Sequence, residues 1–224
     1  MPKDINSPGH NDNRNYDYSE VESEERKEYA VIESFIEGTP SVIDLGCGNG
    51  SLLQLLMQNG KCSRAVGIEI STSGVEMSKK KGIDARPGRI DEKLPFGDNE
   101  FDYAICNVTI QMVMYPEILL KEMKRISKRQ IISFPNFGFY KNRIDHFMRG
   151  RMPKPVLFGY SWYSTGHIHQ LSIADFKELV DHTGGLRIEK FSTVWPGGSL
   201  KDTLTGMFPN LFCLLPVFLL RKTA

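Results

Sequence analysis

The stretch Val42-Ile-Asp-Leu-Gly-Cys-Gly-Asn-Gly50 decides the fold of this chain. Its apolar residues are typical of the end of a buried parallel strand, and three glycines follow at every second position. Leucines at helical spacing begin directly afterwards, over residues 51–57. A strand, a glycine turn and a helix in this order bring backbone N–H groups close to a ligand at the helix N-terminus.

Asp44 distinguishes this glycine loop from phosphate-binding loops. A carboxylate at the strand end would repel a phosphate, and it suits a ligand that carries a cation. The pattern D-x-G-x-G-x-G also differs from the G-x-G-x-x-G of dinucleotide-binding folds, and the Lys-Ser/Thr pair that ends a phosphate loop is missing. An ordinary tight turn is the alternative interpretation of the same glycines.

The complete strand–acid–glycine–helix unit resembles motif I of class I S-adenosylmethionine (SAM) methyltransferases. In that family the glycine loop packs against the methionine end of SAM, and the acid before it helps to hold the ammonium group. The resemblance implies a binding site for SAM or S-adenosylhomocysteine. The loop residues that it assigns to this site are Asp44, Gly46, Cys47, Gly48 and Gly50.

A second acid, Glu69, ends the next predicted strand, residues 64–69. The separation from Asp44 accommodates one helix, a turn and a strand. In nucleotide-binding α/β sheets an acid at this place accepts hydrogen bonds from ribose hydroxyls. We expect Glu69 to do so, with Ile70 beside it in the binding site. A solvated acid at a strand end is the alternative.

The third element of the predicted site departs from the methyltransferase pattern. Many members of the resembled family place an Asp after the third strand, where it meets the adenine amino group, but this chain has Arg89 there and Asp91 two positions later. A guanidinium cannot accept a hydrogen bond. Either Asp91 or backbone carbonyls bind the adenine, or this end of the pocket is altered; Arg89 could still stack on the ring. The predicted site includes Arg89, Ile90 and Asp91.

Residues 94–107 resemble the loop and fourth strand of the same family. Asn107 lies at the carboxyl end of that strand, where open α/β sheets bind their ligands, and it completes the predicted cofactor site. The Pro-Pro-Tyr that follows Asn in amino-group methylases is absent.

No residue stands out as a catalytic base. The weak candidates for an acceptor-activating group are Gln111, Tyr163, His167 and His169. A His acts as a general base near neutral pH, but a structural hydrogen-bonding role is the alternative for each. The two histidines lack a third ligand at a recognisable spacing, so no metal site is expected.

Strands and helices alternate along the chain. The predicted strands cover residues 41–45, 64–69, 83–86, 101–106, 129–134 and 186–194. The predicted helices cover residues 50–59, 72–81, 115–126 and 173–182. This alternation predicts an α/β fold with a doubly wound, mainly parallel sheet of the class I SAM-methyltransferase (Rossmann-like) type.

Residues 1–16 are expected to be disordered and residues 17–224 to form a single domain. A capping box at Ser19 predicts a first helix that ends near Glu37.

Composition narrows the class of protein. The net charge of +1 argues against strong non-specific nucleic-acid binding. The most apolar stretch, residues 207–220, is too short and broken to span a membrane and suggests a core strand with a hydrophobic loop. Four cysteines without paired spacing and a polar N-terminus favour a cytoplasmic protein. Residues 121–154 contain ten bases and two acids, which form either a solvated face or a basic surface for an acidic partner.

Segments after the fifth strand carry a narrower resemblance. They are Ile131-Ile-Ser-Phe-Pro-Asn-Phe-Gly138, Arg149-Gly-Arg-Met-Pro153, Trp162-Tyr-Ser-Thr165 and His167-Ile-His169. Together with Thr109-Ile-Gln111, these segments resemble the methionine biosynthesis protein W (MetW) family, over about residues 40–221. The resemblance implies a SAM-binding protein of methionine biosynthesis that supports homoserine O-acyltransferase. The alternative is an active SAM-dependent methyltransferase for a small polar metabolite, and whether the chain is an enzyme stays open.

Overall fold

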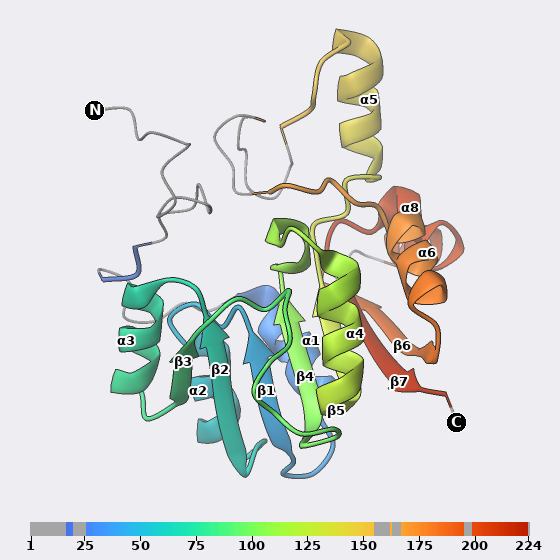
Figure 1. The fold of residues 1–224 in the computed structure, drawn as a ribbon. Coiled ribbons are helices and arrows are strands. Elements are labelled where there is room, and N and C mark those ends of the chain that lie inside the picture. Colours follow the sequence, from blue (N-terminus) through green and yellow to red (C-terminus); the bar gives the residue numbers. More distant parts are fainter. Residues whose placement is uncertain (1–16, 20–25, 155–161, 163–166, 195–198, 224) are drawn as a thin grey trace, which may run out of the picture.

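A computed structural model describes residues 17–19, 26–154, 162, 167–194 and 199–223. It shows a seven-stranded sheet in the order β3-β2-β1-β4-β5-β7-β6, with helices on both faces (Figure 1). The strands are β1 (Ser41–Leu45), β2 (Arg64–Glu69), β3 (Asp84–Pro87), β4 (Phe101–Asn107), β5 (Ser127–Ser133), β6 (Leu186–Thr193) and β7 (Pro216–Lys222). The first five strands are parallel, and β7 runs antiparallel to β5 and β6. The predicted doubly wound, mainly parallel sheet is therefore confirmed.

The strand order reverses at β1, which lies between β2 and β4. The chain runs from β1 through β2 to β3 on one side and then crosses to β4 on the other. In open α/β sheets such a reversal opens a crevice at the carboxyl ends of the strands, and ligands bind there. The glycine loop begins at this point, directly after β1.

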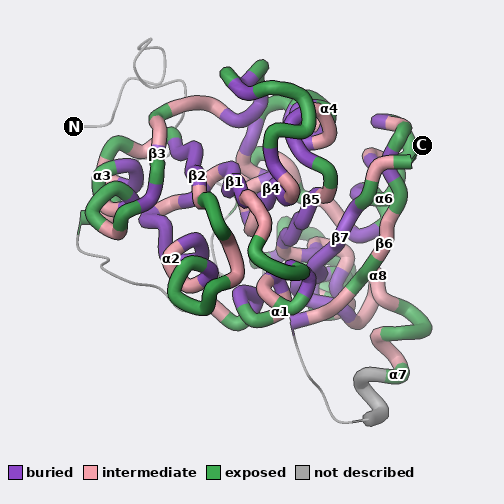
Figure 2. Tube along the Cα trace, turned by 90° about the horizontal axis from the view of Figure 1, so that it is seen from below, coloured by how far each residue is buried: buried purple, intermediate pink, exposed green. Residues whose placement is uncertain are grey.

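Two hydrophobic clusters cover the two faces of the sheet. The first face carries α1 (Lys27–Phe35), α2 (Ser51–Gln58) and α3 (Thr72–Lys80). The opposite face carries α4 (Pro116–Ile126) and α6 (Ile173–Thr183). Figure 2 shows buried residues along the central strands and on the inner sides of these helices. The remaining elements are the 3₁₀ helix η2 (Ile110–Met112), α5 (Tyr140–Arg149), α7 (Ser199–Met207) and α8 (Pro209–Phe212).

The predicted start of the first helix is wrong. The hydroxyl of Ser19 donates to Asp17 Oδ1 over 2.6 Å, and α1 begins at Lys27, with Arg26 at the N-cap position and no side-chain cap. Arg26 has an extended backbone, with φ −117° and ψ 143°, so the helix that ends at Phe35 does not continue back to Ser19. Residues 20–25 lie outside the described residues. The segment predicted to be disordered, residues 1–16, lies outside the described residues.

The expected core strand, β7, begins within the apolar stretch 207–220 and extends to Lys222, and the short helix α8 precedes it. The strand lies between β5 and β6 rather than at the sheet edge. Helix α5 corresponds to no predicted element. Within the described residues, none of the helices has the length and apolar character needed to cross a membrane.

A buried Asn136 fixes the direction in which the chain leaves β5. Its side chain is fully buried, its Oδ1 accepts the N–H groups of Gly138 and Ile173, and its Nδ2 donates to the carbonyls of Asn210 and Cys213. These hydrogen bonds join the chain before α5 to the start of α6 and to α8. Because a buried amide with all its groups paired fits one arrangement, the root of α5 is held rigidly.

Candidate functional site

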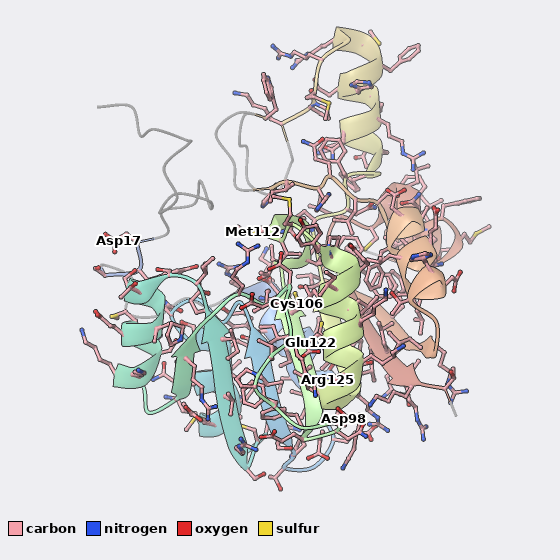
Figure 3. All side chains as sticks on the ribbon, in the orientation of Figure 1. Asp17, Asp98, Cys106, Met112, Glu122 and Arg125 are labelled. Atoms are coloured by element: carbon pink, nitrogen blue, oxygen red, sulfur yellow. The ribbon has the colours of Figure 1, made fainter. Side chains whose placement is uncertain are left out.

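A cleft lies above the carboxyl ends of β1, β2 and β4, where Met112 of η2 forms part of its wall (Figure 3). All the cofactor residues predicted from the sequence line this cleft except Gly50. The topological reversal at β1 and the predicted residues therefore coincide at one site.

Gly50 lies outside the cleft lining, at a position of close packing. It is the N-cap residue of α2 with φ +75°, a backbone conformation that favours glycine. A Cβ atom on Gly50 would lie 2.6 Å from Ile83 Cδ1 and 2.7 Å from Ser78 Oγ. The third glycine of the loop thus allows the loop to pack closely against the α3 side of the fold.

Gly48 lines the cleft. Its φ is +55°, and its N–H donates to Glu69 Oε2 over 2.8 Å. A Cβ atom here would lie 3.2 Å from the hydroxyl of Tyr18, which lines the same cleft. A larger residue at this position would therefore take up space between the loop and Tyr18.

Asp44 is a buried acid without its full set of partners. Its side chain lines the cleft, the residue is 2% exposed, and Oδ1 has no hydrogen-bonding partner among the described residues. Burial raises the pKa of Asp44 to about 7, the negative charge of Glu69 adds to the rise, and Arg26 opposes it. A cation bound in the cleft would supply the missing partner and lower this pKa.

Glu69 is fixed by the backbone on both of its oxygens. Oε2 accepts the N–H of Gly48, and Oε1 accepts the N–H of Ser71 over 2.9 Å. A carboxylate oxygen accepts more than one hydrogen bond, so both oxygens keep capacity for a ligand. The side chain is thus oriented toward the cleft with acceptor sites to spare.

Arg89 and Asp91 are paired with each other. Nε and a terminal nitrogen of Arg89 lie 3.2 and 3.1 Å from the two oxygens of Asp91. Oδ2 of Asp91 also accepts the N–H groups of Met114 and Tyr115, over 3.0 and 3.3 Å. The carboxylate of Asp91 is therefore already engaged with Arg89 and with the chain before α4.

The end of β4 carries a strained backbone. Val108 lines the cleft with φ +53°, which is rare for a β-branched residue, and its N–H donates to the carbonyl of Ser133 over 3.0 Å. Asn107, one residue earlier, accepts the hydroxyl of Ser133 and donates to Glu28 Oε1. Such strain persists where the surrounding contacts fix the conformation, and it is common at binding sites.

The catalytic candidates do not gather in one place. His167 lines the cleft, whereas His169 lies outside it with Nε2 3.4 Å from the carbonyl of Met114. Gln111 is buried and does not line the cleft, and its Nε2 donates to the carbonyl of Val108 over 2.9 Å. Tyr163 lies outside the described residues. In the part of the chain that the structure describes, no group of three His, Cys, Asp or Glu residues is placed to hold a metal ion.

Sequence reasoning missed the part of the cleft that comes from the segment before β1. Tyr18, Arg26 and Tyr29 all line the cleft. Their approach depends on tertiary contacts, such as the hydrogen bond from the Tyr18 N–H to Ser73 Oγ, and no local pattern signals it. Thr109 and Met112 also line the cleft, and their positions soon after Asn107 in the sequence could have indicated that they do.

Comparison with known proteins agrees with this geometry. The family model described as methionine biosynthesis protein MetW matches residues 26–220. The bifunctional methionine biosynthesis protein MetXA/MetW of Rhodopirellula baltica is 36% identical over 162 residues, which are 68% of this chain and 26% of that protein. The chain therefore spans about a quarter of the length of that relative.

Solved structures show the same fold. A SAM-dependent methyltransferase from Mesorhizobium loti has a TM-score of 0.62 at 14% identity, covering 88% of this chain and 98% of that one. Another from Aquifex aeolicus has a TM-score of 0.56 at 16% identity, covering 92% and 94%. The family match covers nearly all of the chain from α1 to β7. The chain belongs to the methionine biosynthesis protein MetW family and has the Rossmann-like fold of class I SAM-dependent methyltransferases.

Proposed function

We propose that this MetW-family protein binds SAM or S-adenosylhomocysteine in the cleft and supports homoserine O-acyltransferase as an accessory subunit. The observation that carries the first half is Asp44, a buried carboxylate with an unpartnered oxygen beside a glycine turn. A buried ionised acid is costly unless a cation pairs with it. The methionine end of SAM carries such a cation, its ammonium group.

The other cleft residues fit the rest of the ligand. Gly48 leaves room for it, and Glu69 offers acceptor oxygens for the ribose hydroxyls. For the adenine, the planar face of Arg89 can stack on the ring. The backbone beside Ile90 or Oδ1 of Asp91, which accepts one hydrogen bond from Arg89, can accept from the adenine amino group. SAM itself supplies an activated methyl group when bound.

The proposed partner comes from the relative in Rhodopirellula baltica, in which MetXA and MetW parts share one chain. We transfer this association to two separate proteins, this chain and a homoserine O-acyltransferase. SAM is the downstream product of methionine, so an accessory subunit that binds it can report the output of the pathway. This role requires no acceptor-activating group in the cleft.

Calorimetry with SAM tests the ligand half of the proposal. Gly48→Val should abolish binding because its side chain would fill the cleft. Gly60→Val is the matched control, since Gly60 also has a positive φ, +64°, but a Cβ atom there meets nothing within 4 Å. Glu69→Ala should weaken SAM by about 1–3 kcal/mol, the usual loss for hydrogen bonds to a charged group. No binding by the wild type at millimolar SAM would end the cofactor proposal.

A pull-down from the native host, with and without SAM, tests the partner half. Homoserine O-acyltransferase should co-purify, and deleting the gene should lower the acyltransferase activity and slow growth without methionine. An acyltransferase of unchanged activity in the deletion strain would contradict the accessory role.

The second candidate function is methyl transfer to a small polar metabolite. The observation in its favour is His167, which lines the cleft and is a residue type that acts as a general base. His167→Ala should abolish this activity, whereas His169→Ala, outside the cleft, should preserve it. Growth without methionine that survives His167→Ala, with SAM binding retained, would favour the accessory role.

A further inference from the structure

We propose that the exposed apolar stripe of α5, formed by Ile144, Phe147 and Met148, is a docking surface for a partner protein. The complementary surface is an apolar groove with an acidic rim. The identity of the partner rests on the function proposed above: we take it to be the homoserine O-acyltransferase.

The stripe is exposed to an unusual degree for its composition. Ile144 is 56% exposed, Phe147 86% and Met148 71%. Their spacing of three and four residues places them on one side of the helix. Asn142 is the one residue of α5 that is buried. The helix projects from the body of the molecule beyond the carboxyl edge of the sheet (Figure 1). Grouped exposure of large apolar side chains marks an interaction site more often than scattered exposure does.

The root of this projecting helix is well anchored. The amide of Asn142 donates to the carbonyl of Phe137 over 3.2 Å, and the ring of Tyr140 lies 5.8 Å from that of Phe212 in α8. The hydrogen bonds of Asn136 hold the preceding chain. A rigid root presents the stripe in one orientation, and such preorganisation reduces the entropy lost on binding.

The structure divides the basic stretch 121–154 into two parts with different roles. All the bases before residue 130 except Lys121 make contacts within the fold: Arg125 on α4, for example, forms ion pairs with Glu122 and Asp98, far from α5 (Figure 3). Around α5 the only ion pair among the described residues joins Arg149 to Asp145, over 3.0 Å. The bases around α5 that pair with no acid among the described residues, and so remain for a partner, are Lys141, Arg143, Arg151 and Lys154, all exposed. Bases beside an apolar stripe complement an acidic rim.

The dimensions of the stripe favour a protein over a membrane. Three side chains at spacings i, i+3 and i+4 match the anchors of a helix that lies in a protein groove. Phe, Met and Arg are also enriched in protein interfaces. Membrane anchoring needs a larger apolar face or a second signal. Since no α5 residue lines the cleft, the partner and SAM can bind at the same time.

The test measures the affinity of the purified protein for the homoserine O-acyltransferase of the same organism. Met148→Asp is compared with Met57→Asp, the same substitution at a methionine that is 42% exposed on α2. We expect Met148→Asp and Phe147→Asp to weaken the complex by about 30-fold or more, as for residues at the centre of an interface. Met57→Asp should change the affinity by less than about twofold. All three variants should keep their SAM affinity.

The outcomes separate the docking surface from the proposed function. Loss in the α5 variants alone, with stronger binding at low salt, supports the surface. Equal binding by wild type and α5 variants overturns the surface and leaves the accessory role standing. A wild type that does not bind the acyltransferase overturns both. Binding of the wild type to anionic phosphatidylserine vesicles, or self-association, lost in Phe147→Asp while acyltransferase binding persists, also overturns the surface.

Discussion

Asp44 and Phe147 lie in opposite environments, and each environment is unfavourable for the side chain. Asp44 is a carboxyl that is 2% exposed, and Phe147 is an aromatic ring that is 86% exposed. The acid lies at a strand end inside the sheet, while the ring lies on a helix that projects from it. A bound cation would stabilise the carboxylate of Asp44, and contact with an apolar surface would stabilise the ring of Phe147.

The buried charge and the exposed ring affect the stability of the fold differently. A charge enclosed by protein destabilises the folded state directly, because the unfolded chain would hydrate it. An exposed ring is hydrated in both states, so it costs the folded state little. The charge of Asp44 should therefore strengthen SAM binding while it lowers the stability of the ligand-free protein. The side chains of the α5 stripe should affect binding with little effect on stability.

The largest effect on stability should come from the anchor of α5 rather than from its tip. Asn136→Ala removes four hydrogen bonds and leaves buried groups unpaired, so the free energy of unfolding should fall by about 2–4 kcal/mol. Asn142→Ala, also at a buried asparagine, loses one hydrogen bond and should cost about 1 kcal/mol. Denaturant unfolding measures both, and equal losses would show that Asn136 is not the anchor.

Asp44→Asn tests whether the same buried charge strengthens SAM binding and lowers the stability of the ligand-free protein. SAM affinity should fall by about 1.5–3 kcal/mol because the ammonium loses a charged partner. The ligand-free protein should unfold at a higher temperature, since the buried charge is gone. Calorimetry and thermal unfolding measure the two effects. A variant with lower stability would mean that the ionised Asp44 is already well compensated in the ligand-free protein.

The pH dependence of the wild type gives a third comparison. Since the pKa of Asp44 is about 7, SAM affinity should drop about tenfold per pH unit below that value, as the carboxyl takes up a proton. Stability without ligand should change in the other direction. The unfolded chain releases this proton near its ordinary pKa of 3.8, so rising pH between these two values destabilises the folded state. In Asp44→Asn, neither the pH dependence of SAM affinity below pH 7 nor the loss of stability between the two pKa values should be seen.

Phe147→Ser should give the smallest effect. Without a partner, its free energy of unfolding should stay within about 0.5 kcal/mol of the wild type, as for other surface substitutions. A loss of several times that size would show that Phe147 packs within the fold, and would undermine the contrast with Asp44.

Local patterns predicted the cleft better than they predicted its surroundings. Asp44 and Glu69 could be located because each ends a strand that is recognisable from its own residues. Tyr18 could not, because it reaches the cleft through a contact with Ser73 far along the chain. Helix α5 was missed although Ile144, Phe147 and Met148 have helical spacing, because its other residues are mostly polar or charged and no capping side chain marks its start.

The position of β7 has a consequence for synthesis. This strand follows β5 and β6 along the chain, so it leaves the ribosome after both of them, yet it pairs with both. Until it arrives, β5 ends the sheet with open backbone groups beside Ile131 and Ile132, and β6 has no neighbour to pair with. Open strand edges recruit other chains. The nascent protein is therefore most prone to aggregation in the interval between the emergence of β6 and that of β7.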